Sequence, residues 1–405
     1  MNTLKRILLI ALSLVLSASV LVACDTADSG ETETEKSTEN ATQAEKLEDF
    51  DYTSVNIADF VSVPKSEYES SKVTLGTKYI ITDADVEKSI EDKLFDNKTK
   101  TNGDTQVKDQ PIKLGDSAFI YYTGYLGDKA FEGGSNASDT KPYELSIGSG
   151  SFIPGFEEGL IGVIPADTSK DAPFDLNVTF PENYSSTELA GKAVVFKVWI
   201  EYVVQYTIPT LTDDFVKNTI KFDGTAEEYK ANLKTTMQEE ATASAESEAL
   251  NAVMSLLTTK SEFKKLPEES VNFWYQSYLS QIQQYVDMYQ MYGMQVTLDS
   301  MACQMLGLEA GSDWQTPLTD MAKNVVKSIL VYYGVAANEG ITVTDAEYVA
   351  KLKELADYYS SAEKTYTPEE IESEIGKATL MQNILMSKVD EFLIDHCTIE
   401  YTDKE

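Results

Sequence analysis

The residues most suited to form a binding or catalytic site are aromatic side chains between positions 111 and 206. They stand in blocks that also contain glycine, threonine or proline: Tyr121-Tyr122-Thr123-Gly124, Phe131-Glu132-Gly133-Gly134 and Ile153-Pro154-Gly155-Phe156. The blocks hold no nucleophile paired with a base, no Cys/His cluster and no phosphate-binding loop. A site built from them would bind a substrate and reshape it, because it offers no group for cleavage.

Short alternating apolar runs would position these aromatic residues. The runs are Ala118-Ile120-Tyr122, Tyr143-Leu145-Ile147, Phe174-Leu176-Val178 and Val194-Phe196-Val198, with glycine, proline and aspartate turns between them. This pattern predicts a small antiparallel sheet. Phe156 and Leu160 are four residues apart, which predicts one short helix across the sheet. Sheet and helix together would enclose an apolar pocket.

The order of these blocks between residues 115 and 203 resembles the FKBP-type peptidyl-prolyl isomerase domain. Two positions narrow the resemblance: Phe156 stands where drug-binding members carry Trp, and Glu132 where they carry Asp. Both features, and the blocks at 179–184 and 188–192, are shared with the FKBP domain of trigger factor. The chain is therefore similar to trigger factor, although Tyr122 is more typical of other FKBPs.

The resemblance assigns roles to individual residues. It implies catalytic roles for Tyr122, Phe131, Glu132, Ile153 and Phe156, with the Ile153 backbone amide donating to the bound carbonyl. It implies substrate contacts for Tyr143, Phe152, Phe196 and Tyr184. No metal and no cofactor is implied.

The implied reaction is rotation about an X-Pro bond. It meets a barrier of about 18–20 kcal/mol because amide resonance must be broken. Water stabilises the planar imide more than the twisted form, so an apolar cavity with a carbonyl donor favours the twisted state.

Composition excludes several classes of partner. The chain has 67 acidic and 33 basic residues and a net charge of -34, so its surface repels nucleic acid and anionic lipid head groups. Its three cysteines are too scattered for a disulfide framework or a thiolate metal site, although a single Cys303–Cys397 bridge stays open. The one histidine, His396, is interpreted as an ordinary helix-terminal residue.

The N-terminus predicts export and a lipid anchor. Residues 1–23 combine two basic residues with an apolar run from Ile7 to Leu16, which is typical of a secretory leader. Leu21-Val22-Ala23-Cys24 matches the bacterial lipobox and predicts lipidation of Cys24; ordinary cleavage beside an incidental cysteine is the alternative. Residues 24–50 have almost no large apolar side chain and are expected to form a disordered tether.

Two further segments flank the predicted isomerase, residues 111–206. In residues 51–110, a strand over Lys72–Ile81 precedes Thr82-Asp83-Ala84-Asp85, the pattern of a capping box that opens a helix. The resemblance implies that this segment packs with the C-terminal body. No counterpart of the ribosome-binding domain of trigger factor is found, so ribosome binding is not implied.

Residues 207–405 are predicted to be helical throughout. Helices are expected from Tyr229, from Tyr275, from Leu318, after the cap Thr344-Asp345-Ala346-Glu347, and after Thr367-Pro368-Glu369-Glu370, the last running towards Leu393. The second carries a stripe of Tyr, Met and Gln up to Tyr292 that suits adaptable contact with varied clients. Ordinary helix packing explains the spacing equally well, and the resemblance favours a client-binding arm.

Together these features predict an α+β chain with an FKBP-like sheet domain and a helical trigger-factor-like domain. The expected function is a peptidyl-prolyl isomerase and chaperone for unfolded, proline-containing exported proteins at the outer face of the cytoplasmic membrane. The alternative is a holdase whose FKBP fold only binds. A solute-binding lipoprotein is disfavoured because no paired α/β lobes are predicted.

Overall fold

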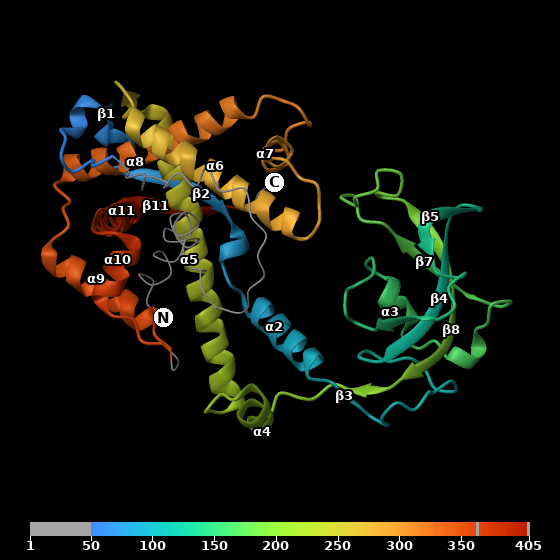
Figure 1. The fold of residues 1–405 in the computed structure, drawn as a ribbon. Coiled ribbons are helices and arrows are strands. Elements are labelled where there is room, and N and C mark those ends of the chain that lie inside the picture. The colour runs from blue at the N-terminus through green and yellow to red at the C-terminus, as the bar shows by residue number, and fades with distance from the viewer. Residues whose placement is uncertain (1–49, 362–363, 403–405) are drawn as a thin grey trace, which may run out of the picture. The chain divides into compact units, whose positions relative to one another are not determined.

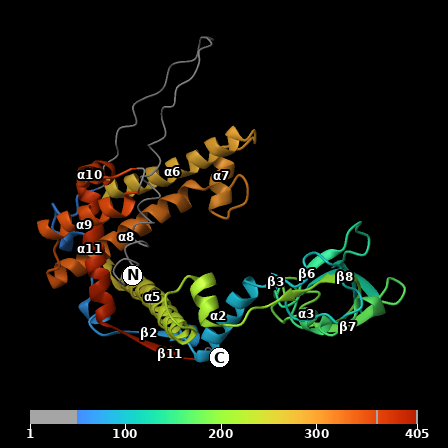
Figure 2. The ribbon, with the colours of Figure 1, turned by 90° about the horizontal axis from the view of Figure 1, so that it is seen from below.

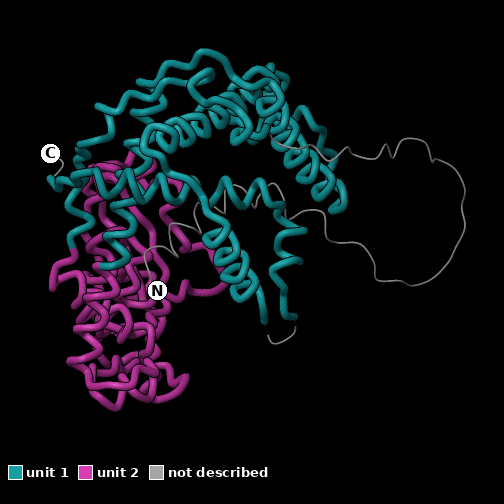
Figure 3. Tube along the Cα trace, turned by 90° about the vertical axis from the view of Figure 1, so that its left-hand side faces the viewer, with its two compact units in different colours: residues 1–80, 239–405 teal, residues 81–238 magenta. Residues whose placement is uncertain are grey.

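A computed structural model describes residues 50–361 and 364–402. The predicted leader, Cys24 and all but the end of the tether lie outside the described residues. The chain divides into two compact units (Figure 3): the described residues of 1–80 together with those of 239–405, and residues 81–238.

The unit formed by residues 81–238 contains a five-stranded sheet. Its elements are α2 (Asp83–Asp96), β3 (Thr99–Lys100), β4 (Ser117–Leu126), β5 (Lys129–Ser135), β6 (Tyr143–Ser146), α3 (Phe156–Leu160), β7 (Phe174–Thr179), β8 (Ala193–Val204), β9 (Tyr206–Thr207) and α4 (Asp213–Phe215). The strand order is β5-β4-β8-β7 with antiparallel pairing, and β6 pairs with the first half of β4 while β5 pairs with its second half. Figures 1 and 2 show the sheet curving around α3.

Alternate residues of the strands point their apolar side chains at α3. Ala118 and Ile120 on β4, Val198 on β8, and Phe156 and Leu160 on α3 are fully buried. Burial of such side chains contributes roughly 25 cal/mol per Å² of apolar surface, so this contact holds α3 on the sheet. The predicted antiparallel strands and crossing helix are confirmed.

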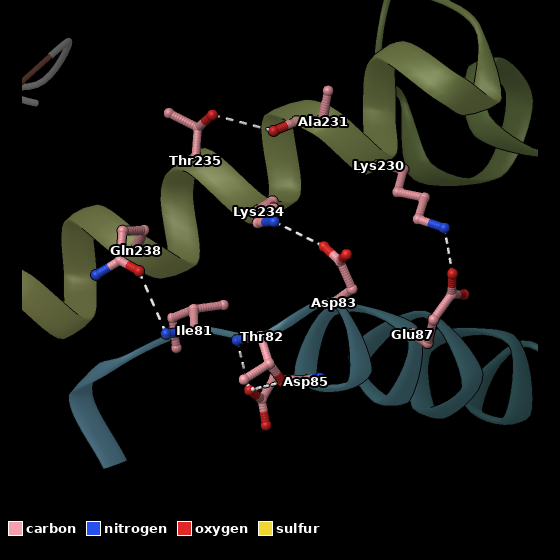
Figure 4. Close-up of polar contacts among 10 residues, drawn as sticks. All are labelled: Ile81, Thr82, Asp83, Asp85, Glu87, Lys230, Ala231, Lys234, Thr235 and Gln238. Atoms are coloured by element: carbon pink, nitrogen blue, oxygen red, sulfur yellow. Dashed lines mark hydrogen bonds and ion pairs between the residues drawn. The ribbon is translucent and has the colours of Figure 1, made fainter. Parts of the chain in front are cut away.

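Helix α2 lies beside the start of α5 (Ala226–Lys260), and polar contacts join the two helices (Figure 4). The predicted capping box of Thr82 and Asp85 is present. Lys234 pairs with Asp83 at 2.6 Å, Lys230 pairs with Glu87, and the Gln238 side chain accepts from a backbone amide at the start of α2 at 3.2 Å. These ion pairs face solvent, so they contribute little to stability and are weakened by salt.

The second unit is largely helical. Its elements are β1 (Val61–Ser62), β2 (Ser71–Gly76), the rest of α5, β10 (Glu262–Phe263), α6 (Glu268–Met291), α7 (Leu298–Met305), α8 (Gln315–Glu339), α9 (Asp345–Tyr359), α10 (Pro368–Ile375), α11 (Lys377–Asp395) and β11 (Cys397–Thr402). Helix α8 has the most buried face, and Tyr333 on it stacks on Tyr52 at 5.0 Å between ring centroids. Within the described ranges, no helix is long and apolar enough to cross a membrane.

Three details differ from the sequence-based expectation. The C-terminal region is not wholly helical, because β11 pairs in parallel with β2 and β10 pairs with β1. The last predicted helix is two helices, since Gly376, with φ 86°, ends α10 and starts α11 at an angle that other residues rarely adopt. The strand predicted over 72–81 ends at Gly76 and a 3-10 turn follows.

A buried carboxyl group makes the stability of this unit depend on pH. Asp390 on α11 is 4% exposed and accepts a hydrogen bond from the Tyr332 hydroxyl at 2.7 Å. Burial raises the pKa of Asp390 from 3.8 to about 6, against the opposing effect of that hydrogen bond. Because the folded pKa lies above the unfolded one, the stabilisation is complete below about pH 4 and is lost as the pH rises towards about 6.

We expect Asp390→Asn to raise the free energy of unfolding at pH 7.5 by up to about 3 kcal/mol, because the amide is neutral and still accepts from Tyr332. Urea unfolding followed by circular dichroism between pH 4 and pH 7.5 measures this. Glu391→Gln, which neutralises an exposed carboxylate on the same helix, is the control and should keep the parental slope. Equal pH slopes for the parent and Asp390→Asn would contradict the prediction.

Candidate functional site

The sheet and α3 bring the predicted aromatic residues into one ring cluster. The Tyr122 ring on β4 lies 5.4 Å from Phe152, 6.0 Å from Phe156 and 6.0 Å from Phe196 between centroids, in edge-to-face geometry. Phe156 lies 4.4 Å from Phe152 and 5.1 Å from Phe196. Aromatic pairs at these separations attract beyond their burial, so four predicted residues form a rigid apolar floor.

The remaining predicted aromatics extend this ring cluster on two sides. Tyr143 on β6 contacts Phe152 at 5.5 Å, and Phe131 on β5 contacts Phe196 at 5.7 Å. Tyr184 joins only through Phe180, a residue that sequence reasoning did not select, at 4.5 Å. A Cβ atom at position 134 would collide with the Phe131 ring, so the glycine of the Phe-Glu-Gly-Gly block allows that ring to reach the cluster.

Two hydrogen-bond donors at the cluster have no acceptor within the described part of the chain. One is the backbone amide of Ile153, whose side chain packs against the same core. The other is the Tyr122 hydroxyl; burial raises its pKa, and Tyr143 and Asp139 raise it further, so it stays protonated. Glu132 differs, because its side chain is exposed on β5 and does not join the cluster.

Glu157, which sequence reasoning missed, holds the loop that carries Phe152. Its carboxylate is 3% exposed and accepts from the backbone amides of Gly148 at 2.8 Å, Gly150 at 3.1 Å and Phe152 at 3.1 Å. Ser149 and Ser151 add hydroxyl donors. Burial alone would raise the pKa of Glu157, but these hydrogen bonds lower it below 4.5. The sequence signal was the first-turn glutamate that follows Phe156.

Asn136 is a second missed residue, and it fixes the backbone at Tyr122. Its side chain is 6% exposed, accepts from the Tyr122 amide at 2.7 Å and donates to the Ile120 carbonyl at 3.1 Å. The backbone N–H of Asn136 also donates to the Tyr122 carbonyl. A lone asparagine after a Gly-Gly-Ser run gives no periodic signal, so only the fold reveals this contact.

A cavity of about 560 Å³ opens beside the cluster, where β7 and β8 meet the turn before α3. It is lined by Tyr125, Gly127, Pro154, Gly155, Asn177, Val178, Thr179, Ala193, Val194 and Val195. None of the nine predicted site residues lines it. It reaches the site only at the turn between Ile153 and Phe156, so the ring cluster and its two donors remain the candidate site.

Comparison with known proteins assigns the chain to a family. The trigger factor of Clostridioides difficile (strain 630) is 32% identical over 343 residues, covering 83% of this chain and 74% of that protein. The chain belongs to the trigger factor family. A second trigger factor, from Desulforamulus reducens, is 31% identical over 349 residues, covering 85% of this chain and 73% of that protein.

Two family models match separate parts of this member of the trigger factor family. Residues 108–205 match the FKBP-type peptidyl-prolyl cis-trans isomerase model, and residues 225–395 match the model of the bacterial trigger factor C-terminus. The predicted α+β class, an FKBP-like sheet domain with a largely helical trigger factor domain, is confirmed. A solved trigger factor chaperone structure aligns over 83% of this chain and 72% of that chain, at 18% identity and a TM-score of 0.37.

The trigger factor C-terminal region has a second candidate surface, where α6 and α7 lie side by side (Figures 1 and 2). Within the predicted stripe, Ile282 is buried in the α6–α7 core, and Tyr278 and Tyr289 are partly buried against it. The exposed large apolar residues are Tyr285, Met288, Met291, Tyr292, Met294 and Met305, which we call the α6–α7 tip. The tip adjoins this core and presents flexible thioethers to solvent.

Proposed function

We propose that the chain is a peptidyl-prolyl cis-trans isomerase and a folding chaperone for unfolded, proline-containing polypeptides. The observation that carries the catalytic proposal is the ring cluster with two unengaged donors. A proline ring seated against the half-buried rings of Tyr122 and Phe152, above the buried Phe156, would leave water, which disfavours the charge-separated planar imide. The Ile153 amide would hold the carbonyl that precedes the proline, so the twisted state is bound better than the planar one.

The roles of individual residues follow from these positions. The half-buried rings of Phe131 and Phe152 would contact the residue before the proline, which favours an apolar side chain there. The Tyr122 hydroxyl would donate to a second peptide carbonyl. Glu132 is exposed, so any contribution to catalysis would be electrostatic and small.

Isomerisation of an X-Pro tetrapeptide, measured by NMR exchange with the purified protein, tests this proposal. Metal-independent acceleration with a preference for an apolar X supports it. A well-folded protein that does not accelerate exchange would support the alternative, a holdase in which the FKBP fold only binds.

The chaperone half of the proposal rests on the α6–α7 tip. Met291 is 82% and Tyr292 is 75% exposed, although both are apolar. Exposed, flexible methionines adapt to many apolar partners. Weak binding there would raise the effective concentration of client prolines near the isomerase.

We expect the triple variant Tyr285→Ser, Met291→Ser and Tyr292→Ser to bind an unfolded client about tenfold more weakly, since removing this apolar contact costs at least about 1.4 kcal/mol. Its tetrapeptide isomerisation should equal that of the parent. The control variant is Val349→Ser with Tyr358→Ser, which removes equally exposed apolar residues from α9. Client affinity and refolding of a proline-limited protein are the readouts; equal losses in both variants would remove the tip from the proposal.

We propose further that the protein works outside the cytoplasmic membrane, tethered by a lipid on Cys24. The proposal is supported by the basic and apolar leader and the Leu-Val-Ala-Cys sequence that ends at Cys24. A single diacylated cysteine and a flexible tether would keep the folded units near the membrane surface.

Replacing Cys24 by alanine is expected to move the protein from the membrane fraction to the soluble or secreted fraction. Detergent phase partitioning of cells that express the parent or Cys24→Ala measures this change. Cys303→Ala is the control, because that thiol is buried in the helical unit and should not affect partitioning. Retention of the Cys24→Ala protein on membranes would contradict the lipid anchor.

A further inference from the structure

The α6–α7 tip concentrates the methionines of this chain. Of its 11 methionines, Met288, Met291, Met294, Met301 and Met305 fall between residues 288 and 305. Four of these are exposed: Met291 at 82%, Met294 at 51%, Met305 at 45% and Met288 at 39%. A soluble protein usually buries a side chain of this kind, so the grouping is a distinct chemical feature of the tip.

The fifth methionine provides an internal contrast. Met301 is 4% exposed and packs in the α6–α7 core with Ile282, Val286 and Trp314. An oxidant that arrives by diffusion meets the four exposed sulfur atoms of the tip, and that of Met321 on α8 (39% exposed), before Met301, because the reactivity of a thioether follows its exposure. The same helix pair therefore carries reactive and protected methionines.

The isomerase region contrasts with the tip. Residues 111–206 contain neither methionine nor cysteine. The ring cluster is made of phenylalanine and tyrosine, which hydrogen peroxide oxidises far more slowly than thioethers. A mild oxidant can therefore alter the tip and leave the isomerase unchanged.

We propose that the four exposed methionines of the α6–α7 tip form a reversible oxidation site that regulates client binding. The sulfur attacks one peroxide oxygen, the O–O bond breaks and an S–O bond forms. Sulfur loses two electrons, and the peroxide is reduced to water with the proton it already carries. The product is a methionine sulfoxide, which is polar and which methionine sulfoxide reductases can reverse.

Oxidation changes the physical character of the tip. Each sulfoxide replaces an adaptable apolar group with a strong hydrogen-bond acceptor that prefers water. The apolar surface offered to an unfolded segment then shrinks, so client binding weakens while proline isomerisation continues. This inference rests on the proposed client-binding function of the tip.

The test treats the purified full chain with hydrogen peroxide and follows three quantities. Peptide mass spectrometry should show Met291 and Met294 oxidised about tenfold faster than Met301. Affinity for an unfolded client should fall about tenfold, tetrapeptide isomerisation should not change, and sulfoxide reductases should restore the affinity. Oxidation of Met301 as fast as Met291 would overturn the assignment of the site.

Two quadruple variants separate the tip from the rest of the chain, each compared with its own untreated sample. With Met288, Met291, Met294 and Met305 replaced by leucine, the treated-to-untreated ratio of client affinity should stay near one, although both Cys303 and Cys397 remain. With Met237, Met321, Met381 and Met386 replaced by leucine, which includes the exposed Met321 of α8, affinity should fall on treatment as in the parent. A tip-leucine variant that loses affinity like the parent would overturn the proposal.

Failure of the proposed function gives a different result. If the tip does not bind clients, the untreated variant with the four tip methionines replaced by glutamine keeps parental client affinity, and peroxide leaves the parent's affinity unchanged. Selective oxidation and enzymatic reduction of the four sulfur atoms would still establish the modification site, and regulation of client binding would be excluded.

Discussion

Replacing Tyr122 by alanine is expected to lower kcat/KM for an apolar X-Pro tetrapeptide by at least about tenfold, equivalent to about 1.4 kcal/mol of transition-state stabilisation. Tyr122 touches Phe152, Phe156 and Phe196, so its removal opens the cluster to water. Tyr122→Phe keeps the ring and removes only the hydroxyl donor. We expect it to lower kcat/KM by about two- to tenfold, which corresponds to the net free energy of one hydrogen bond.

The neighbouring tyrosine provides the matched control. Tyr121 lies on the opposite face of β4, where its ring stacks on Trp199 at 5.2 Å and does not reach the ring cluster. Tyr121→Ala removes the same atoms from the same strand, so it reports the cost of loosening the sheet. Equal losses of kcat/KM in Tyr121→Ala and Tyr122→Ala would mean that destabilisation, and not the site, explains both.

Glu157→Ala is expected to have an effect at least as large, about hundredfold in kcat/KM. The three backbone amides that donate hydrogen bonds to Glu157 would lose their charged acceptor. Each buried donor left without an acceptor costs about 1–3 kcal/mol. The loop from residue 148 would then move, and Phe152 and the Ile153 amide would leave their positions. About 2.7 kcal/mol of lost transition-state stabilisation corresponds to that hundredfold decrease.

A conservative variant of Glu157 and a variant of its neighbour distinguish loss of the loop position from destabilisation of the whole fold. Glu157→Gln retains one acceptor oxygen and should lose less activity than Glu157→Ala, with kcat reduced more than KM raised. Glu158→Gln changes the next, exposed carboxylate and should keep near-parental activity. Because the folded pKa of Glu157 is lowered, its contribution is present at neutral pH and is lost only as the pH falls below the ordinary glutamate range. An active, stable Glu157→Ala protein would show that the loop does not need this acceptor.

Much of the candidate site could be predicted because its residues lie in local, recognisable blocks. The alternation of Ala118, Ile120 and Tyr122 predicts that the Tyr122 ring lies on the inner face of the sheet, since the side-chain period of a strand is two. Asn136 could not be predicted in this way. Its side chain reaches backbone groups of β4 from the loop after β5, a contact that depends on how the two strands are joined.

The helical region shows the same division at longer range. Helical periodicity placed Tyr278, Tyr285 and Tyr289 on one helix, but the packing of α7 decides that Tyr278 and Tyr289 join a core while Tyr285 stays exposed. A pattern of three and four residues specifies a helix face and does not specify what covers it. The parallel pairing of β11 with β2 likewise joins segments more than 300 residues apart.

Local patterns along the chain were enough to predict the class of fold, the order of the two domains, the aromatic character of the candidate site and the capping boxes at Thr82 and Thr344. Each of these depends on contacts within a few residues or on a repeated period. Three features became visible only in the folded chain: Glu132 is exposed, Glu157 holds the loop before α3, and the methionines near residue 291 remain uncovered. Burial and hydrogen-bond partners come from elements that meet only in the folded chain, so one segment of sequence does not carry them.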